Sequence, residues 1–272
     1  MMPSLPTDVR ILEGEEEAKT IAYVRNLIAQ KPKVRDVSHW ERGWKENLDA
    51  YLATRDPDAL MPKYIRPGLP LRCNGRFVMP DDPFCEWKWY RKLLEYISDR
   101  WLADSYSVLE IGSGSGHNLA WLKLRYPEKS ISGWDWSPSA VAIARVVSDG
   151  GSIFNMFKPP PDAFPILQTT TVLTVGAMEQ TGTEWQPLLN FLLATKPKRV
   201  VHVEPILDWY NPNNPVDQTA IEAHLARDFW TGYLDALINL MDEGKIAIKD
   251  TQYTSFGSLL VCGYSILVWR PL

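Results

Sequence analysis

From residue 107 to the end of the chain, short apolar segments alternate with longer helical patterns. The apolar segments predict five strands, at 107–112, 130–135, 151–155, 171–176 and 199–204. Helical stretches lie between most of them. Strands that alternate with helices at this spacing indicate a parallel sheet that is covered by helices on both faces.

The C-terminal part of the sequence predicts a different ending for this sheet. A long helix is expected over 216–244, with apolar residues at helical spacing and Gly244 as its stop. Two strands follow, at 245–253 and 263–269, and they are separated only by residues 254–262. This connection is too short for a helical crossover, so we expect the two strands to be antiparallel.

The N-terminal segment has a different pattern. Amphipathic helices are expected over 14–31 and 39–55, and a further helix over 85–102. Residues 62–84 are rich in proline and show no clear periodicity, which is typical of a loop. We therefore predict a helical cap that contributes to the substrate site, followed by an α/β domain. The predicted bounds are 1–104 for the cap and 105–272 for the domain.

Composition and charge narrow the class of protein. The chain has 272 residues and a formal net charge of -4, and it has no run of Lys or Arg, so a nucleic-acid partner is not expected. We find no secretory signal pattern, and the most apolar run, 259–269, is about half as long as a membrane-spanning helix. Three scattered cysteines fit a reducing compartment better than a disulfide framework or a zinc site. We expect a cytoplasmic protein without membrane insertion, and the oligomeric state stays open.

A glycine-rich loop follows the first predicted strand of the domain, in the segment "SVLEIGSGSGHNLAWLK". Gly112, Gly114 and Gly116 alternate with other residues, and Asp135 ends the next strand 19 residues after Gly116. Glycines at such a turn let a ligand approach the backbone, and an acid at that distance can accept hydrogen bonds from ribose hydroxyls. The alternatives are a purely structural tight turn for the glycines and a helix cap for Asp135. The dinucleotide motif would need a glycine at His117, so the pattern favours an adenosine-type ligand over a nicotinamide cofactor.

The segments "VLEIGSGSGHNLAWL" and "GWDWSPSAVAIA" resemble those of the class I S-adenosylmethionine-dependent methyltransferases, over about residues 105–270. The resemblance implies a Rossmann-like fold, with a mostly parallel seven-stranded sheet and an antiparallel last strand. It also implies S-adenosylmethionine (SAM) as cofactor and S-adenosylhomocysteine (SAH) as product. Asn155 stands where the family often has an Asp. The cofactor-binding residues that it implies are Glu110, Gly112, Ser113, Gly114 and Gly116 at the amino acid part, Asp135 at the ribose, and Trp136, Asn155 and Met156 at the adenine.

Candidate catalytic residues lie where the fourth and fifth strands end, because ligands of open α/β sheets bind beyond the carboxyl ends of the strands. His202 and Glu204 are two positions apart, so they point to the same side of the strand, and either is a candidate general base. Glu179, in "VGAMEQTG", is the third candidate. Many relatives have Glu-His there, and Gln180 cannot serve as a base.

Two other interpretations of the His202 segment stay open. One is a His–Glu pair that is satisfied under a helix. The other is a metal site formed with Asp208, although this spacing fits no specific signature, and we predict no metal.

The acceptor is expected to contact the N-terminal cap and the segment after the fifth strand. Arginines in the loop "YIRPGLPLRCNGRF" (Arg66, Arg72 and Arg76) are suited to hold a carboxylate or a phosphate, and the aromatic residues of "FCEWKWY" to form a wall. Solvated arginines and core aromatics are the alternatives. The predicted substrate-binding residues are Arg72, Arg76, Trp89, Tyr90, Asp208 and Tyr210.

The sequence therefore predicts a SAM-dependent methyltransferase that acts on a small polar acceptor. The preferred reaction is O-methylation of a hydroxylated substrate such as a sugar or a glycan end. The alternative is N-methylation of a small amine, for which Glu179 and Glu204 are suited. More distant alternatives are a nicotinamide-dependent oxidoreductase and a non-catalytic cofactor-binding subunit of a partner.

Overall fold

A seven-stranded sheet forms the centre of the molecule, in a computed structural model that describes residues 1–30, 37–160 and 166–272. The strand order is β6-β5-β4-β7-β8-β11-β9, with β4 to β8 parallel and β11 antiparallel to both of its neighbours. This arrangement confirms the predicted fold class. The strands are β4 (Ser107–Ile111), β5 (Ser130–Asp135), β6 (Gly150–Ile153), β7 (Thr170–Val175), β8 (Arg199–Glu204), β9 (Ile246–Gln252) and β11 (Ser265–Pro271).

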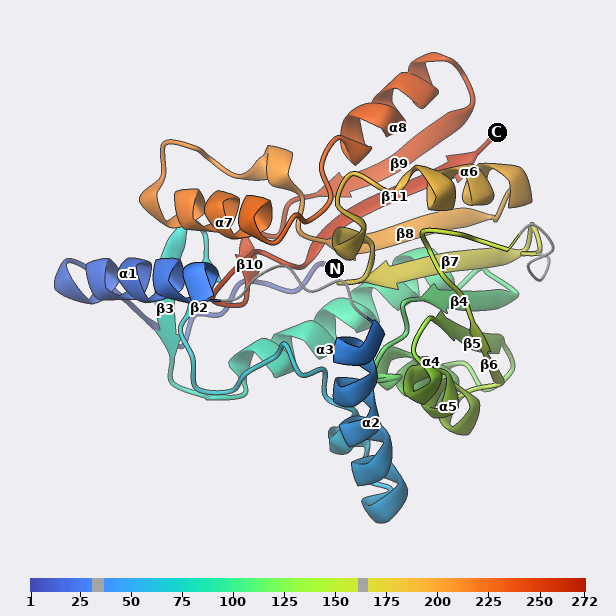
Figure 1. The fold of residues 1–272 in the computed structure, drawn as a ribbon, viewed down its shortest axis with the longest axis horizontal. Coiled ribbons are helices and arrows are strands. Elements are labelled where there is room, and N and C mark those ends of the chain that lie inside the picture. Colours follow the sequence, from blue (N-terminus) through green and yellow to red (C-terminus); the bar gives the residue numbers. More distant parts are fainter. Residues whose placement is uncertain (31–36, 161–165) are drawn as a thin grey trace.

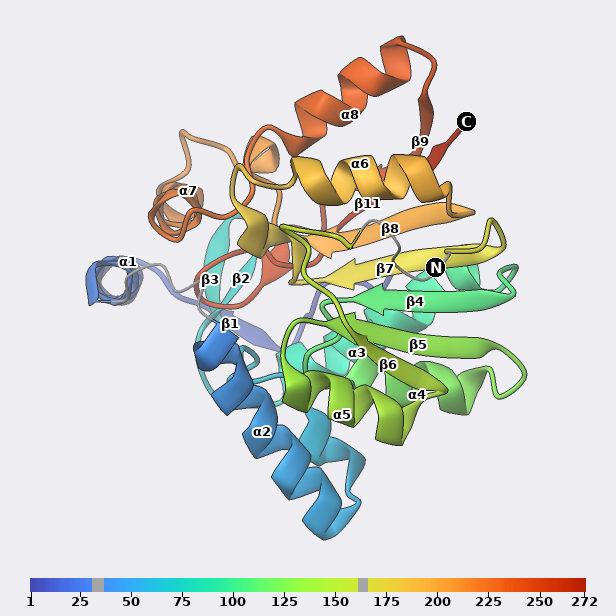
Figure 2. The ribbon, with the colours of Figure 1, turned by 45° about the vertical axis from the view of Figure 1, so that its right-hand side comes forward.

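Helices cover both faces of this sheet (Figures 1 and 2). One face packs against α3 (Cys85–Ile97), α4 (His117–Arg125) and α5 (Pro138–Val147). The other face packs against α6 (Gln186–Thr195) and α8 (Tyr233–Asp242). The central strands are buried on both sides, which explains why they read as continuous apolar runs in the sequence.

A second, smaller sheet corrects the expectation of a purely helical cap. Its order is β1-β3-β2-β10, and all of its strands are antiparallel to their neighbours. Two of these strands lie in the proline-rich stretch, and strands of two to five residues are too short to show a clear alternation. The strands are β1 (Val9–Ile11), β2 (Leu71–Cys73), β3 (Arg76–Pro80) and β10 (Phe256–Gly257).

Two helices of the cap agree with the sequence pattern. They are α1 (Glu15–Gln30) and α2 (Val37–Thr54), and the last residue of the first predicted helix, Lys31, lies outside the described residues. Both helices lie near the carboxyl ends of the parallel strands (Figure 2). Short helices at Pro57–Leu60 (η1) and Ser98–Leu102 (η2) complete the cap. Within the described residues, no helix combines the length and the apolar character that crossing a membrane requires.

The prediction of one long helix over 216–244 is wrong, because two separate helices occupy this segment. The first is α7 (Pro215–Ala226), and α8 begins only at Tyr233. Asp228 and Gly232 between them have positive φ angles of 49° and 72°, which no α-helix contains. The N–H of Trp230 donates to the carbonyl of Glu179, so this break binds the segment that follows β7.

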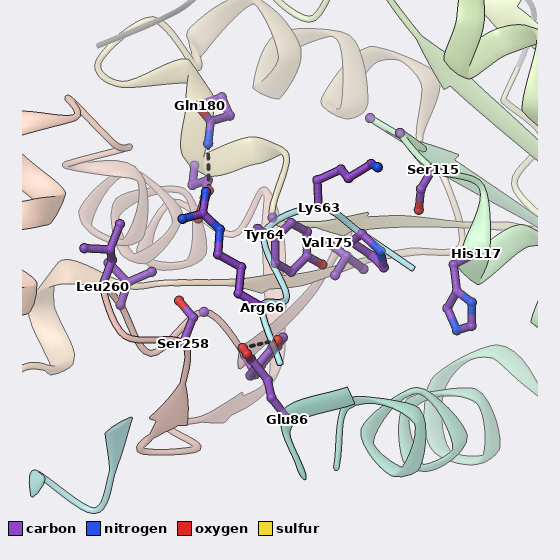
Figure 3. A pocket seen from close by; sticks show the side chains of 18 of the residues that line it. Lys63, Tyr64, Arg66, Glu86, Ser115, His117, Val175, Gln180, Ser258 and Leu260 are labelled. Carbon is purple, nitrogen blue, oxygen red and sulfur yellow. Dashed lines mark hydrogen bonds between the residues drawn. The ribbon is translucent and has the colours of Figure 1, made fainter. Parts of the chain in front are cut away.

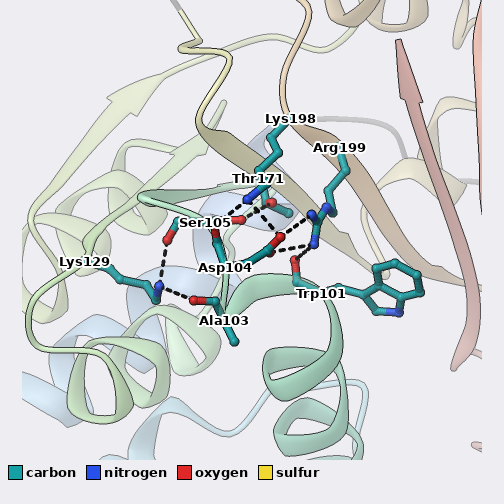
Figure 4. Close-up of polar contacts among 8 residues, drawn as sticks. All are labelled: Trp101, Ala103, Asp104, Ser105, Lys129, Thr171, Lys198 and Arg199. Atoms are coloured by element: carbon teal, nitrogen blue, oxygen red, sulfur yellow. Dashed lines mark hydrogen bonds and ion pairs between the residues drawn. The ribbon is translucent and has the colours of Figure 1, made fainter. Parts of the chain in front are cut away.

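An ion-pair network fixes the joint between cap and sheet at the amino ends of the strands (Figure 4). Asp104 accepts hydrogen bonds from both terminal nitrogens of Arg199, at 2.8 Å each, and pairs with Lys198 at 2.9 Å. Although burial acts against it, these two cations lower the pKa of Asp104 to about 2. Lys129 donates to two backbone carbonyls, those of Ala103 and Ser105. This end of the sheet is structural, whereas the cavity lies at the opposite end.

Candidate functional site

A cavity of about 270 Å³ lies at the carboxyl ends of β4 and β7, between the sheet and the cap (Figure 3). Its walls come from α2, the loop before β2, α3, the glycine loop, the segment after β7, the break between α7 and α8, and the loop before β11. Aromatic and charged side chains, the glycine loop and an apolar segment line the cavity. Its lining includes Trp40, Trp44, Tyr64, Arg66, Glu86, Glu110, Gly112, Ser113, Gly114, Ser115, His117, Asn118, Glu179, Gln180, Arg227, Phe229, Ser258, Leu259, Leu260, Val261 and Tyr264.

The glycine loop is folded as its sequence requires. Gly112, Gly114 and Gly116 all have positive φ angles, of 75°, 46° and 69°. A Cβ at Gly112 would lie 2.3 Å from the Cβ of Ala177, and one at Gly114 would lie 2.9 Å from the ring of Trp44. Both the backbone conformation and the close neighbours therefore demand glycine here. The loop turns the chain from β4 into α4 and exposes Ser113 and Ser115 to the cavity.

Three buried polar atoms beside this loop lack a hydrogen-bond partner in the protein. They are Oε2 of Glu110, Oγ of Ser113 and Nε2 of His117. The other oxygen of Glu110 accepts from Nδ2 of Asn118 at 2.6 Å, and Asn118 in turn accepts from the Tyr90 hydroxyl at 2.6 Å. Burial raises the pKa of Glu110 to about 8, and the charge of Asp135 adds to this effect. A cationic ligand group would satisfy the free carboxyl oxygen and would favour its ionised form.

Asp135 holds the glycine loop in place. Its carboxylate accepts from the N–H groups of Gly114 at 3.0 Å and Ser137 at 2.9 Å. Burial raises its pKa to about 6. Ser137 is the N-cap of α5. Asp135 does not line the cavity, so its role at the ribose stays a prediction.

Helix α2 lies across the glycine loop and the start of α5. The Glu41 carboxylate accepts from the Ser137 hydroxyl and from both the N–H and the hydroxyl of Ser139. Trp44, one turn further, contacts Gly114. The cap thus closes the glycine-loop side of the cavity.

The residues predicted at the adenine lie outside the cavity, along the edge formed by β5 and β6. Trp136 lies beside Phe157, with ring centroids 5.8 Å apart, and Oδ1 of Asn155 accepts from the Phe157 N–H. Met156 packs against the core under α6 and α8. Their contact with adenine remains a prediction.

Of the three predicted catalytic residues, the structure brings only Glu179 into the cavity. It is the second residue of a short helix, Met178–Thr181 (η3), and its Oε1 accepts a hydrogen bond from Nε2 of Gln180 at 2.7 Å. Burial and the nearby Glu204 charge raise the pKa of Glu179. Glu204 accepts three backbone N–H groups, from Ala177, Met178 and Glu179. Burial raises the pKa of Glu204, and these three donors act against that shift. Because Glu204 is held by this backbone and does not line the cavity, we assign it a positioning role, which corrects its prediction as a base.

His202 is also corrected, because its side chain is 0% exposed and lies under α8 rather than in the cavity. Nδ1 is 2.8 Å from the Thr174 hydroxyl, and Nε2 is 3.0 Å from the Tyr233 hydroxyl and 3.1 Å from the indole nitrogen of Trp269. Burial lowers its pKa to about 3, so the ring is neutral. His202 is thus satisfied under a helix, but the alternative of a His–Glu pair does not describe it, because its partners are Thr174, Tyr233 and Trp269. Among the described residues, no group of His, Cys, Asp or Glu side chains is placed to hold a metal ion.

The two arginines predicted to bind substrate do not reach the cavity. Arg72 is 1% exposed and donates to the carbonyls of Leu259 at 3.0 Å and Val216 at 2.6 Å, and to the Thr219 hydroxyl at 2.6 Å. Arg76 is exposed and pairs with Glu13. Arg72 is therefore a structural tie between β2, α7 and the loop before β11, and Arg76 is a surface residue.

The other predicted substrate residues also lie outside the cavity. Trp89 donates to the carbonyl of Ser4 and packs on Phe256, and Tyr90 supports Asn118 from behind. Asp208 is exposed on a short helix, Leu207–Trp209 (η4), and the Tyr210 hydroxyl accepts from the N–H of Cys262. Trp89, Tyr90 and Tyr210 are therefore buried core residues, and Asp208 is a surface residue.

Glu86 is the main site residue that sequence reasoning missed. It lies on the buried face of α3 and lines the cavity, and its carboxylate accepts from the Tyr264 hydroxyl at 2.8 Å. A signal was present, since Glu86 shares one helical face with Tyr90, Leu93 and Ile97, all of which are buried. A carboxyl on an otherwise apolar face marks a pocket or a buried partner.

The buried Glu86 predicts a stability that falls as pH rises. Burial raises its pKa to about 7 from an ordinary 4.5, so the folded state binds this proton more tightly than the unfolded state. The resulting stabilisation, about 3 kcal/mol, is complete below pH 4.5 and is lost as pH rises through 7. Urea unfolding at pH 5 and pH 8 should show that Glu86→Gln removes about this much of the difference. Glu128→Gln, an exposed control, should leave it unchanged, and an unaltered difference in Glu86→Gln would contradict the assignment.

Comparison with solved structures identifies the fold. PhzM, a pyocyanin biosynthetic protein, matches with a TM-score of 0.52 and 15% identity, over 94% of this chain and 70% of its own. An O-methyltransferase family protein from Burkholderia thailandensis matches with a TM-score of 0.52 and 12% identity, over 95% of this chain and 73% of its own.

The chain has the Rossmann-like fold of the class I methyltransferases. LepI in complex with SAM matches with a TM-score of 0.44 and 15% identity over 66% of this chain, which spans only 46% of the LepI chain. Neither a protein-family model nor a curated protein sequence matches this chain. In the methyltransferase fold, the cavity described above lies at the strand ends where ligands of open α/β sheets bind.

Proposed function

We propose that this protein is a SAM-dependent methyltransferase that acts on a small acceptor. The observation that carries this proposal is the free Oε2 of Glu110, which is buried beside the glycine loop at the cavity. An ammonium group is the natural partner for that oxygen, and SAM carries one on its amino acid part. The unpartnered Ser113 hydroxyl beside it is suited to the carboxylate of the same part.

The bound cofactor would supply an electrophilic methyl group, and the protein supplies binding and orientation. Glu110, Gly112, Ser113, Gly114 and Gly116 would hold its amino acid part, and Asp135, Trp136, Asn155 and Met156 its nucleoside. The apolar walls of the cavity exclude water around the acceptor. Holding the two reactants in line can contribute about 7–11 kcal/mol to lowering the barrier.

A hydroxyl acceptor suits the groups at the centre of the cavity. Glu179 and Glu86 are buried carboxyls with raised pKa values, and either can accept the proton that an oxygen nucleophile loses. Phe229, Leu260 and Val261 make one wall apolar, which fits a ring or a short apolar body better than the sugar that the sequence suggested.

A small amine is the second candidate acceptor. The carboxyls of Glu86, Glu110 and Glu179 share the cavity with the rings of Trp40, Trp44 and Tyr64, and such a set can surround a cation.

Calorimetric titration with SAH tests the cofactor assignment. We expect SAH to bind at micromolar concentration and NADH not to bind. Glu110→Gln should weaken SAH binding by about 10–100-fold, because a charge-assisted hydrogen bond is worth about 1.5–3 kcal/mol. The exposed Glu128→Gln is the matched control and should bind as the wild type does. Equal affinity of the wild type and Glu110→Gln would remove the ammonium assignment, and binding of NADH alone would overturn the proposed function.

A further inference from the structure

The half of the cavity that lies away from the glycine loop has its own chemistry. Figure 3 shows Arg66 reaching towards Gln180, on the side away from Ser115 and His117. Arg227, at the end of α7, lines the same cavity. Two guanidinium groups from segments far apart in the sequence thus face a space that the proposed cofactor site does not use.

Neither arginine is neutralised by an ion pair within the part of the chain that the structure describes. Nε of Arg227 is buried and has no hydrogen-bond partner. Burial lowers the pKa of Arg227; the charge of Glu179 acts against this, and the positive charge of Arg66 adds to it. Two like charges near one another and a buried donor without a protein partner are unfavourable, and an anion bound by both arginines would relieve both costs.

The surroundings of this pair restrict the anion to a small organic one. The Gln180 amide already donates to Glu179. Ser258 offers a hydroxyl at the rim, and Phe229, Leu260 and Val261 form apolar walls. A bare inorganic ion would leave these walls unused, whereas an apolar body with one charged end would fill them.

We propose that Arg66 and Arg227 form an anion subsite that binds the carboxylate of the acceptor, an apolar or aromatic carboxylic acid. Identifying this acid as the methyl acceptor rests on the proposed function, whereas the subsite itself is defined by the two arginines. With its carboxylate held there, the body of the acceptor extends towards Tyr64, Glu86 and Glu179, at the centre of the cavity. The carboxylate then serves as an anchor, and the methyl group is received elsewhere on the molecule.

Ligand-observed fluorine NMR with para-fluorobenzoate and its neutral analogue para-fluorobenzamide tests the subsite. We expect the benzoate to bind the wild type at least tenfold more tightly than the benzamide. Arg66→Gln and Arg227→Gln should each weaken benzoate binding at least tenfold and leave benzamide binding unchanged. Arg76→Gln, an arginine on the surface, is the matched control and should behave as the wild type does.

The outcomes separate this inference from the proposed function. Equal affinity for benzoate and benzamide, or unchanged benzoate binding in both variants, would overturn the subsite. Tighter binding of para-fluorophenyl phosphate than of the benzoate would overturn the carboxylate assignment. SAH binding, measured on the same variants, should be unchanged and reports that they are folded. If the wild type does not bind SAH, the methyltransferase proposal is refuted. Tighter binding of para-fluorobenzoate than of para-fluorobenzamide, measured without SAH, would still support the subsite.

Discussion

Replacing Glu179 with Gln is expected to lower turnover by about 10²–10⁴-fold while SAH affinity changes little. Glu179 is the predicted catalytic carboxyl that the structure places in the cavity, at the end of β7 where the acceptor would meet the cofactor. Gln has the same shape but cannot accept a proton. Initial rates with a saturating acceptor, together with SAH titration, separate a loss of chemistry from a loss of binding.

The pH profile gives this prediction a second readout. Burial and the Glu204 charge raise the pKa of Glu179, and a base acts only when it is deprotonated. Turnover should therefore increase with pH in the neutral to alkaline range and not near the ordinary value of 4.5. Glu179→Gln should remove that limb, and Glu128→Gln should keep it. A limb that persists in Glu179→Gln would move the base to Glu86.

Replacing Arg72 with Met is expected to reduce the free energy of unfolding by about 3 kcal/mol or more. The guanidinium satisfies two carbonyls and a hydroxyl in the interior and lies over the ring of Phe77, 4.8 Å from its centre. Met fills much of the space but leaves the Leu259 carbonyl without its donor. Denaturant unfolding measures the change, and the loop before β11, which lines the cavity, should loosen with it.

The matched control for Arg72 is Arg76, which the sequence placed in the same group. Arg76→Met removes an exposed ion pair with Glu13, so a change of no more than about 0.5 kcal/mol is expected. Similar small effects at both positions would show that the buried hydrogen bonds of Arg72 are not a structural tie.

The sheet could be predicted because its evidence is local. The central strands β4, β7 and β8 are short, largely buried segments rich in Val, Leu and Ile, and the short connection before β11 fixes an antiparallel direction. The glycine loop was predictable for the same reason, since a positive φ at Gly112 depends on that residue and its neighbours.

The acceptor half could not be predicted because distant segments build it. Alternation correctly placed His202 and Glu204 on one side of β8, but it cannot tell that α8 covers His202 while Glu204 reaches the N–H groups of η3. Arg66, Arg72 and Arg76 looked equivalent in sequence. The pairing of β2 with β10 buries Arg72, which lies opposite Gly257. Arg66 lies in the loop before β2 and lines the cavity.

The pairing of β10 with β2 also sets the order in which the chain can fold. Phe256 and Gly257 complete a sheet whose other strands end at Pro80, so these earlier strands cannot complete their sheet until a much later segment has been synthesised. Such a pairing has a high contact order and is slow to form. Until residues 256–261 leave the ribosome, Arg72 has no carbonyl at Leu259 to bind and the cavity has no wall at Leu260 and Val261. A nascent chain therefore holds an incomplete cavity, and a ligand that contacts both the cap and the loop before β11 would favour completion of folding.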